Sequence, residues 1–110
     1  MADLDLSYTP AVELAARIRD GSLSPVTVVE NALDRIETVN AKLNCFCFVY
    51  PGESLDLARQ MEAEAKAGKL RGPMHGGPFV IKDLTPTKGK RTTLGSYAYE
   101  NWVPDFDAPI

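Results

Sequence analysis

The chain has 110 residues, which is the length of one ordinary domain and too short for two independent ones. With 45% hydrophobic and 25% charged residues its composition is that of a globular protein and excludes the disordered class. The formal net charge of −3, from 12 basic and 15 acidic side chains, excludes a broad positive field, so we expect no direct binding of nucleic acid.

Membrane and secretory signals are not apparent. The longest apolar run, Cys45 to Tyr50, has six residues, whereas a membrane-spanning helix needs about 20. The N-terminus carries Asp3 and Asp5 where a secretory signal would carry basic residues, which predicts a cytoplasmic location. Cys45 and Cys47 are one residue apart and would point to the same face of an extended chain, so we expect no disulfide scaffold.

Three helices are predicted from capping signals and apolar spacing. The first starts at Thr9 and Pro10 and ends at Gly21. The second starts at Ser24 and Pro25 and runs to about Val39. The third runs from Ser54 to Gly68, with basic residues at its end that favour the negative pole of the helix dipole.

Two short apolar runs predict strands. Residues 44–50, NCFCFVY, are aromatic and β-branched, and Pro51 with Gly52 would end a strand covered on both faces. A second strand is expected over Phe79–Lys82, after a glycine- and proline-rich turn. Residues 85–96 read as a loop. Helices around two strands predict an α/β fold, a mixed sheet covered by helices, with the sheet incomplete in this chain.

Lys82 is the strongest candidate for chemistry, because it ends an apolar run and Asp83 is the only nearby acid. Burial favours the uncharged form of a lysine, which can then accept a proton as a general base. The alternative is a strand-end lysine whose ammonium reaches water or pairs with Asp83.

Other reactive side chains are expected to be structural. His75 is the only histidine, and together with Cys45 and Cys47 it does not make up a metal site, so we expect no metal dependence. Ser96 is not surrounded by a nucleophile motif and is rejected as an attacking group. Seven of the 12 basic residues lie between Lys66 and Arg91, which is typical of a solvated loop and is also compatible with an anionic substrate or partner.

The segments GPMHGGPFVIKD and TKGKRTTLGS together resemble the first signature block of the amidase signature family. The leading helices also resemble the N-terminal arm of that family, so the resemblance covers essentially the whole chain. One departure is Gly77, where the family usually has a branched aliphatic residue. The matching positions are Gly72, His75, Gly76, Pro78, Ile81, Lys82 and Asp83, followed by Gly89, Thr92, Thr93, Gly95 and Ser96.

The resemblance implies the N-terminal part of the amidase signature fold, with a helical arm at about residues 7–40 and the first core strands and signature block at about 44–110. It implies hydrolysis of a small-molecule carboxylic amide to an acid and ammonia or an amine, by a Ser/cis-Ser/Lys triad without a cofactor or metal. Lys82 would be the base, taking a proton from the nucleophilic serine through the bridging serine.

The two serines of that triad belong to a Gly/Ser-rich block further along in the family, and no such block occurs before Ile110. We therefore expect a truncated chain that is inactive alone and that forms a homo-oligomer or associates with its missing C-terminal part. Two alternatives remain. One is a non-catalytic binding or assembly module derived from the amidase arm. The other, ranked below a general amidase, is the glutaminase-type subunit of a tRNA-dependent amidotransferase.

Overall fold

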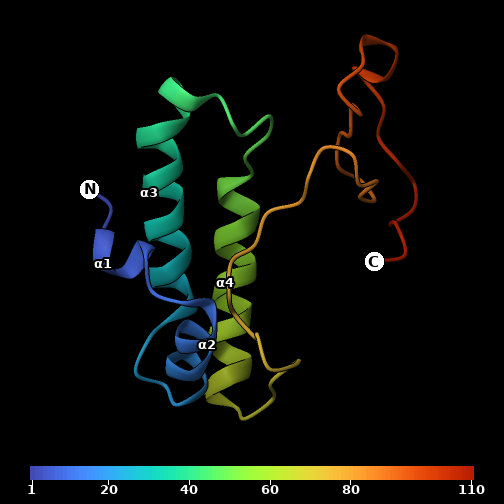
Figure 1. Cartoon of the computed structure of the whole chain (residues 1–110). Coiled ribbons are helices and arrows are strands. Elements are labelled where there is room, and N and C mark those ends of the chain that lie inside the picture. The colour runs from blue at the N-terminus through green and yellow to red at the C-terminus, as the bar shows by residue number, and fades with distance from the viewer. The chain divides into compact units, whose positions relative to one another are not determined.

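The computed structural model describes residues 1–110, which fall into two compact units, Met1–Pro78 and Phe79–Ile110. The first unit holds four α-helices (Figure 1), and the second is irregular apart from one turn of 3-10 helix. The helices are α1 (Leu4–Ser7), α2 (Ala11–Arg19), α3 (Pro25–Leu43) and α4 (Pro51–Lys66), and the 3-10 helix η1 spans Tyr97–Tyr99.

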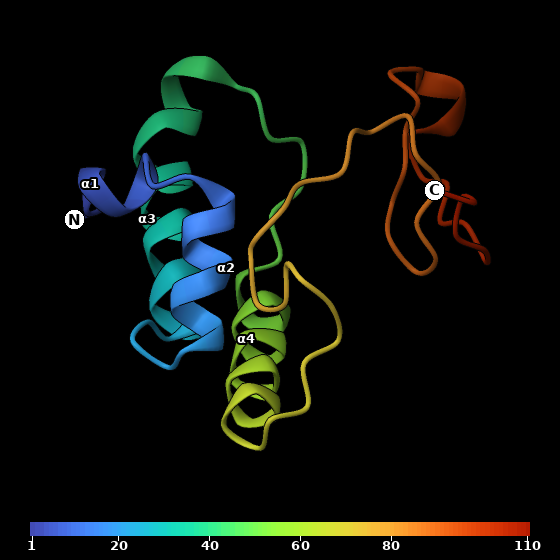
Figure 2. The same ribbon diagram turned by 60° about the horizontal axis from the view of Figure 1, so that its bottom comes forward.

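The helical unit is built on α3 and α4, which lie side by side, with α1 against α3 and α2 in contact with α4 (Figure 2). Its core is formed by Leu14, Ile18 and Val28, against which Leu6 and Leu23 pack. All five side chains are apolar, so burial of their surface is the main force that holds the short helices to the long ones.

The predicted second helix is confirmed together with its start. The Ser24 hydroxyl accepts a hydrogen bond from the N–H of Val26 at 3.1 Å, and Pro25 occupies the first turn. The helix continues past Val39 to Leu43 and ends where Asn44 adopts a left-handed conformation, φ 49°. The apolar stripe stops earlier than the helix does, because the last turn is exposed.

The other two predicted helices exist with shifted starts. Helix α2 has Pro10, not Thr9, at its N-cap position. Helix α4 begins at Pro51, where the sequence pattern predicts the end of a strand, because proline is equally well suited to the first turn of a helix. Helix α1 was not predicted; its start is capped by the Asp3 carboxylate, which accepts from the N–H of Leu6 at 3.1 Å.

The predicted α/β fold is wrong, because the structure is helical, with 46% helix and no strand. Residues 79–82 are extended without a hydrogen-bonded neighbour, and Phe79 and Val80 keep 83% and 70% of their surface exposed. Aromatic and β-branched residues favour a strand only where a paired ladder and a covering layer are present, and neither predicted strand has them here.

Residues 44–50 follow the side chain of Asn40 instead of a neighbouring strand. The Asn40 side-chain oxygen accepts from the N–H groups of Cys45 and Phe46, both at 2.9 Å, and its amide donates to the carbonyl of Phe46 at 3.2 Å. Three backbone groups are thereby satisfied locally, so this segment has less need of a sheet.

Replacing Asn40 by alanine should therefore destabilise the helical unit by about 1–2 kcal/mol, because three backbone groups lose their partner. Urea unfolding measures the loss, and amide hydrogen exchange at Cys45 and Phe46 should accelerate. Lys42→Ala, in the exposed last turn of α3, is the matched control and should change neither. Unchanged exchange at Cys45 and Phe46 in the Asn40 variant would contradict this assignment.

Candidate functional site

The first half of the signature block, residues 72–78, is a turn that packs on the helical unit. His75 lies in this turn and is buried, with 7% of its surface exposed. Its Nδ1 accepts from the N–H of Arg71 at 3.0 Å, so the ring proton is on Nε2, which lies 2.8 Å from the carbonyl oxygen of Met61 in α4 and donates to it. Both ring nitrogens are occupied, and His75 therefore ties the turn to α4.

Close packing also requires glycine at position 76. Gly76 has φ +81°, and a Cβ built on it would lie 3.1 Å from the Cβ of Pro25 and 3.2 Å from Cγ2 of Ile18. The turn therefore approaches the core where α2 and α3 meet, closer than any side chain would permit.

Charged side chains fasten the same region. The Arg71 guanidinium donates to both oxygens of Glu64, at 2.7 and 2.6 Å, and this ion pair lowers the pKa of Glu64 and raises that of Arg71. The guanidinium of Arg19 in α2 donates to the carbonyl of Pro73 at 3.2 Å. A hydrogen bond from Ser24 and then the neighbouring Lys66 lower the pKa of Glu62.

These two glutamates predict an acid-sensitive helical unit. Their pKa values lie below the ordinary glutamate value of about 4.3, so their contribution to stability is complete above that pH and is lost as the pH falls through the lowered values. The thermal midpoint should fall between about pH 5 and pH 3, and less steeply in Glu64→Gln. The exposed Glu30→Gln is the control, and equal slopes for Glu64→Gln and the parent chain would contradict the prediction.

The second half of the block lies in the unit Phe79–Ile110 and closes on Asp83. Oδ1 of Asp83 accepts from the N–H of Thr93 at 2.8 Å, and Oδ2 accepts from the hydroxyl of the same threonine. The carbonyl of Asp83 accepts from the N–H of Leu94 at 3.0 Å. We call this set of three hydrogen bonds the Asp83 clasp.

Lys82 is held at the start of the clasp by its backbone. Its carbonyl accepts from the N–H of Thr85 at 2.9 Å, while its side chain is exposed. The expectation of a lysine at the end of a covered strand is therefore not met within this segment, since residues 79–82 form no strand.

A tight turn follows Thr93. Leu94 and Gly95 both have positive φ, 53° and 69°, and the N–H of Ser96 donates to the carbonyl of Thr93 at 2.9 Å. Two successive positive φ values define a type I′ turn, which is unusual with leucine in the first central position. The Ser96 hydroxyl accepts from the N–H of Ala98 at 3.2 Å and so caps η1.

The rest of the second unit is held by backbone hydrogen bonds between its two halves. The N–H of Thr92, a residue only 2% exposed, donates to the carbonyl of Trp102 at 3.0 Å, and that of Gly89 donates to Pro104 at 2.9 Å. Trp102 also lies between the rings of Tyr99 and Phe106, with ring centres 5.5 and 6.3 Å away. The loop that carries the clasp is thus ordered without regular secondary structure.

The cysteines take no part in this arrangement. Cys45 and Cys47 are exposed free thiols, and no group of three or more histidine, cysteine, aspartate or glutamate side chains lies close enough to hold a metal ion. None of the helices combines the length with the apolar character that crossing a bilayer demands.

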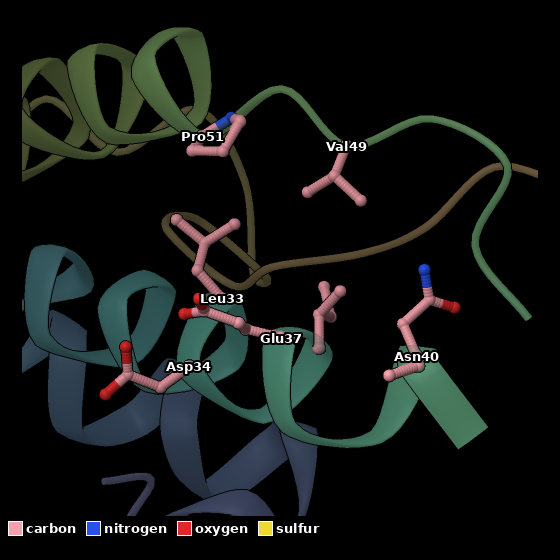
Figure 3. A pocket seen from close by; sticks show the side chains of 8 residues that line it. Leu33, Asp34, Glu37, Asn40, Val49 and Pro51 are labelled. Carbon is pink, nitrogen blue, oxygen red and sulfur yellow. The ribbon is translucent and has the colours of Figure 1, made fainter. Parts of the chain in front are cut away.

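One groove in the helical unit was not predicted. It has a volume of about 490 Å³ and lies between α3 and residues 49–51, where α4 begins (Figure 3). Its side chains are mainly apolar, with two carboxylates and one amide and no nucleophile or base among them. The lining residues are Leu33, Asp34, Ile36, Glu37, Asn40, Ala41, Val49 and Pro51.

Sequence reasoning identified Lys82 but missed the clasp beside it. The sequence suggests Asp83 only as an ion-pair partner of Lys82, and Thr93 only as a position that matches the signature block. The available signal was an acid directly after an apolar run, followed ten residues later by a threonine pair next to a glycine.

Comparison with known proteins defines the class of molecule to which this site belongs. The family model described as Amidase matches residues 27–110, which is most of the chain and includes both halves of the signature block. The protein therefore belongs to the amidase family, and the resemblance seen in its sequence is confirmed.

The similar curated proteins share one name, that of a glutamyl-tRNA(Gln) amidotransferase subunit. The protein of this name from Streptomyces coelicolor is 38% identical over 106 residues, which is 96% of this chain and 21% of the relative. That of Renibacterium salmoninarum is 39% identical over 96% of this chain and 20% of the relative. That of Lachnospira eligens is 40% identical over 94% and 21%. The chain thus spans about a fifth of the length of the curated relatives it matches.

Proposed function

We propose that this chain is the N-terminal segment of an amidase that hydrolyses a carboxylic amide to an acid and ammonia or an amine. Lys82 is the base of a Ser/cis-Ser/Lys triad, and residues 7–40 form the helical arm of the enzyme. The enzyme acts in the cytoplasm. Membership of the amidase family supports the reaction class, and the observation that carries the role of Lys82 is the Asp83 clasp, which holds the backbone at that residue.

In the proposed mechanism the Lys82 amine accepts the proton of the nucleophilic serine through the bridging serine, and the serine oxygen then attacks the amide carbon. A charged ammonium has no lone pair with which to accept that proton. Because Lys82 is exposed in this segment, the mechanism requires further polypeptide to cover it, since burial favours the uncharged amine.

A chimera tests the proposal. In the Streptomyces coelicolor relative, the segment that matches this chain is replaced by residues 1–110, and release of ammonia from glutamine and from simple carboxamides is measured beside the parent protein. The chimera should hydrolyse an amide, and the 110-residue polypeptide by itself should not. A folded chimera that releases no ammonia from substrates that the parent hydrolyses would refute the proposal.

A second candidate is a narrower form of the first. The names of the similar proteins favour one component of a glutamyl-tRNA(Gln) amidotransferase, which acts together with other subunits. In that case the chimera, mixed with the remaining subunits from Streptomyces coelicolor, should amidate glutamyl-tRNA(Gln). Hydrolysis of simple carboxamides without any such transfer would favour a free-standing amidase.

A further inference from the structure

The backbone at Lys82 and Asp83 is fixed by its neighbours on both sides. The carbonyl of Lys82 accepts from Thr85, three residues later, and the carbonyl of Asp83 accepts from Leu94 at 3.0 Å. These two bonds come from different parts of the loop, so they restrict the direction in which the Lys82 side chain leaves the chain.

The Asp83 carboxylate is used completely by one residue. Thr93 donates its N–H to Oδ1 at 2.8 Å and its hydroxyl to Oδ2, and its hydroxyl oxygen accepts in turn from the N–H of Gly95 at 3.2 Å. The ion pairs of the structure do not include one between Lys82 and Asp83. The carboxylate next to Lys82 is therefore turned toward Thr93.

This arrangement matters for a lysine that has to act as a base. A carboxylate that is free to bond an adjacent ammonium stabilises the charged form of the lysine and so opposes proton acceptance. The two Thr93 donors occupy both carboxylate oxygens and remove that competition.

We infer that Asp83 and Thr93 are positioning residues for Lys82, which hold its backbone and keep the neighbouring carboxylate from pairing with its amine. This inference rests on the proposed function of Lys82 as the base. It assigns no contact with substrate to either residue.

The test uses the active chimera and compares Thr93→Val with Thr93→Ser, since valine keeps the shape of threonine and loses the hydroxyl, while serine keeps it. Thr93→Val should lower kcat by about 10- to 100-fold with little change in KM, and should move the rising limb of the kcat profile to higher pH. Thr93→Ser should recover most of kcat. Thr87→Val is the control, since its hydroxyl donates only to the carbonyl of Thr85, and it should leave kcat unchanged.

The outcomes separate this inference from the proposed function. If Lys82→Ala abolishes turnover while Thr93→Val keeps the kcat and the pH profile of the parent chimera, the positioning role is refuted and the base assignment stands. If Lys82→Ala keeps its activity, both fall together. Where Thr93→Val does not fold, Asp83→Asn decides in its place, because it keeps an acceptor for the Thr93 hydroxyl or N–H but lacks the charge; an unchanged pH profile there refutes the inference.

Discussion

Replacement of Lys82 by alanine in the chimera is expected to lower kcat/KM for amide hydrolysis by at least about three orders of magnitude, because a catalytic triad without its base loses most of its rate. Lys82→Arg should be nearly as damaging, since a guanidinium stays charged and cannot accept a proton. Ammonia release under saturating and limiting substrate measures both kcat and KM.

The control for this result is Lys88→Ala, which removes an exposed lysine from the same loop. Its backbone N–H, which donates to Oδ1 of Asp107 at 2.8 Å, is unaffected by the substitution. Near-parental activity in Lys88→Ala shows that loss of a loop cation is not by itself harmful. Activity within about tenfold of the parent in Lys82→Ala would refute Lys82 as the base.

Gly76→Ala is expected to be the most damaging small substitution for stability in the helical unit. It combines a left-handed conformation, which costs a residue with a Cβ about 1–2 kcal/mol, with overpacking against Pro25 and Ile18, which adds about 1–3 kcal/mol. Urea unfolding followed by helical circular dichroism measures the sum.

Gly68→Ala separates the two contributions. Gly68 has φ +71°, close to that of Gly76, but nothing lies within 4 Å of a Cβ built there. It should therefore lose only the conformational part, about 1–2 kcal/mol. Equal losses at the two glycines would mean that residues 72–78 do not pack against the core as described.

The helices could be predicted because their signals are local. Ser24 followed by Pro25 specifies a helix start through two neighbouring residues, and the apolar spacing that follows needs only one face to be buried. Pro51 shows the limit of such signals, since proline is compatible with the end of one element and the start of the next.

The strands could not be predicted reliably, because a strand depends on a partner distant in the sequence. Residues 45–50 have the composition of a buried strand, yet the side chain of Asn40 takes up the backbone groups of Cys45 and Phe46 first. Propensity describes what a segment does on a paired and covered surface, and it cannot say whether that surface is present.

The candidate site was predictable in part. Lys82 stands out in the sequence because it is a charged residue directly after an apolar run. The contact between Asp83 and Thr93 spans ten residues of loop and depends on the positive φ of Leu94, a conformation that leucine rarely adopts. No local pattern predicts such a turn, so only the structure reveals the clasp.

Chemical rescue of the Lys82→Ala chimera tests the role of Lys82 most directly. Added ethylamine should restore formation of the carboxylic acid product at a rate proportional to the concentration of uncharged amine, because the small amine can occupy the place of the missing side chain and accept the proton. Tetramethylammonium, which has no lone pair, should restore nothing. If no primary amine restores hydrolysis in a variant that still binds the amide, proton acceptance by Lys82 is contradicted.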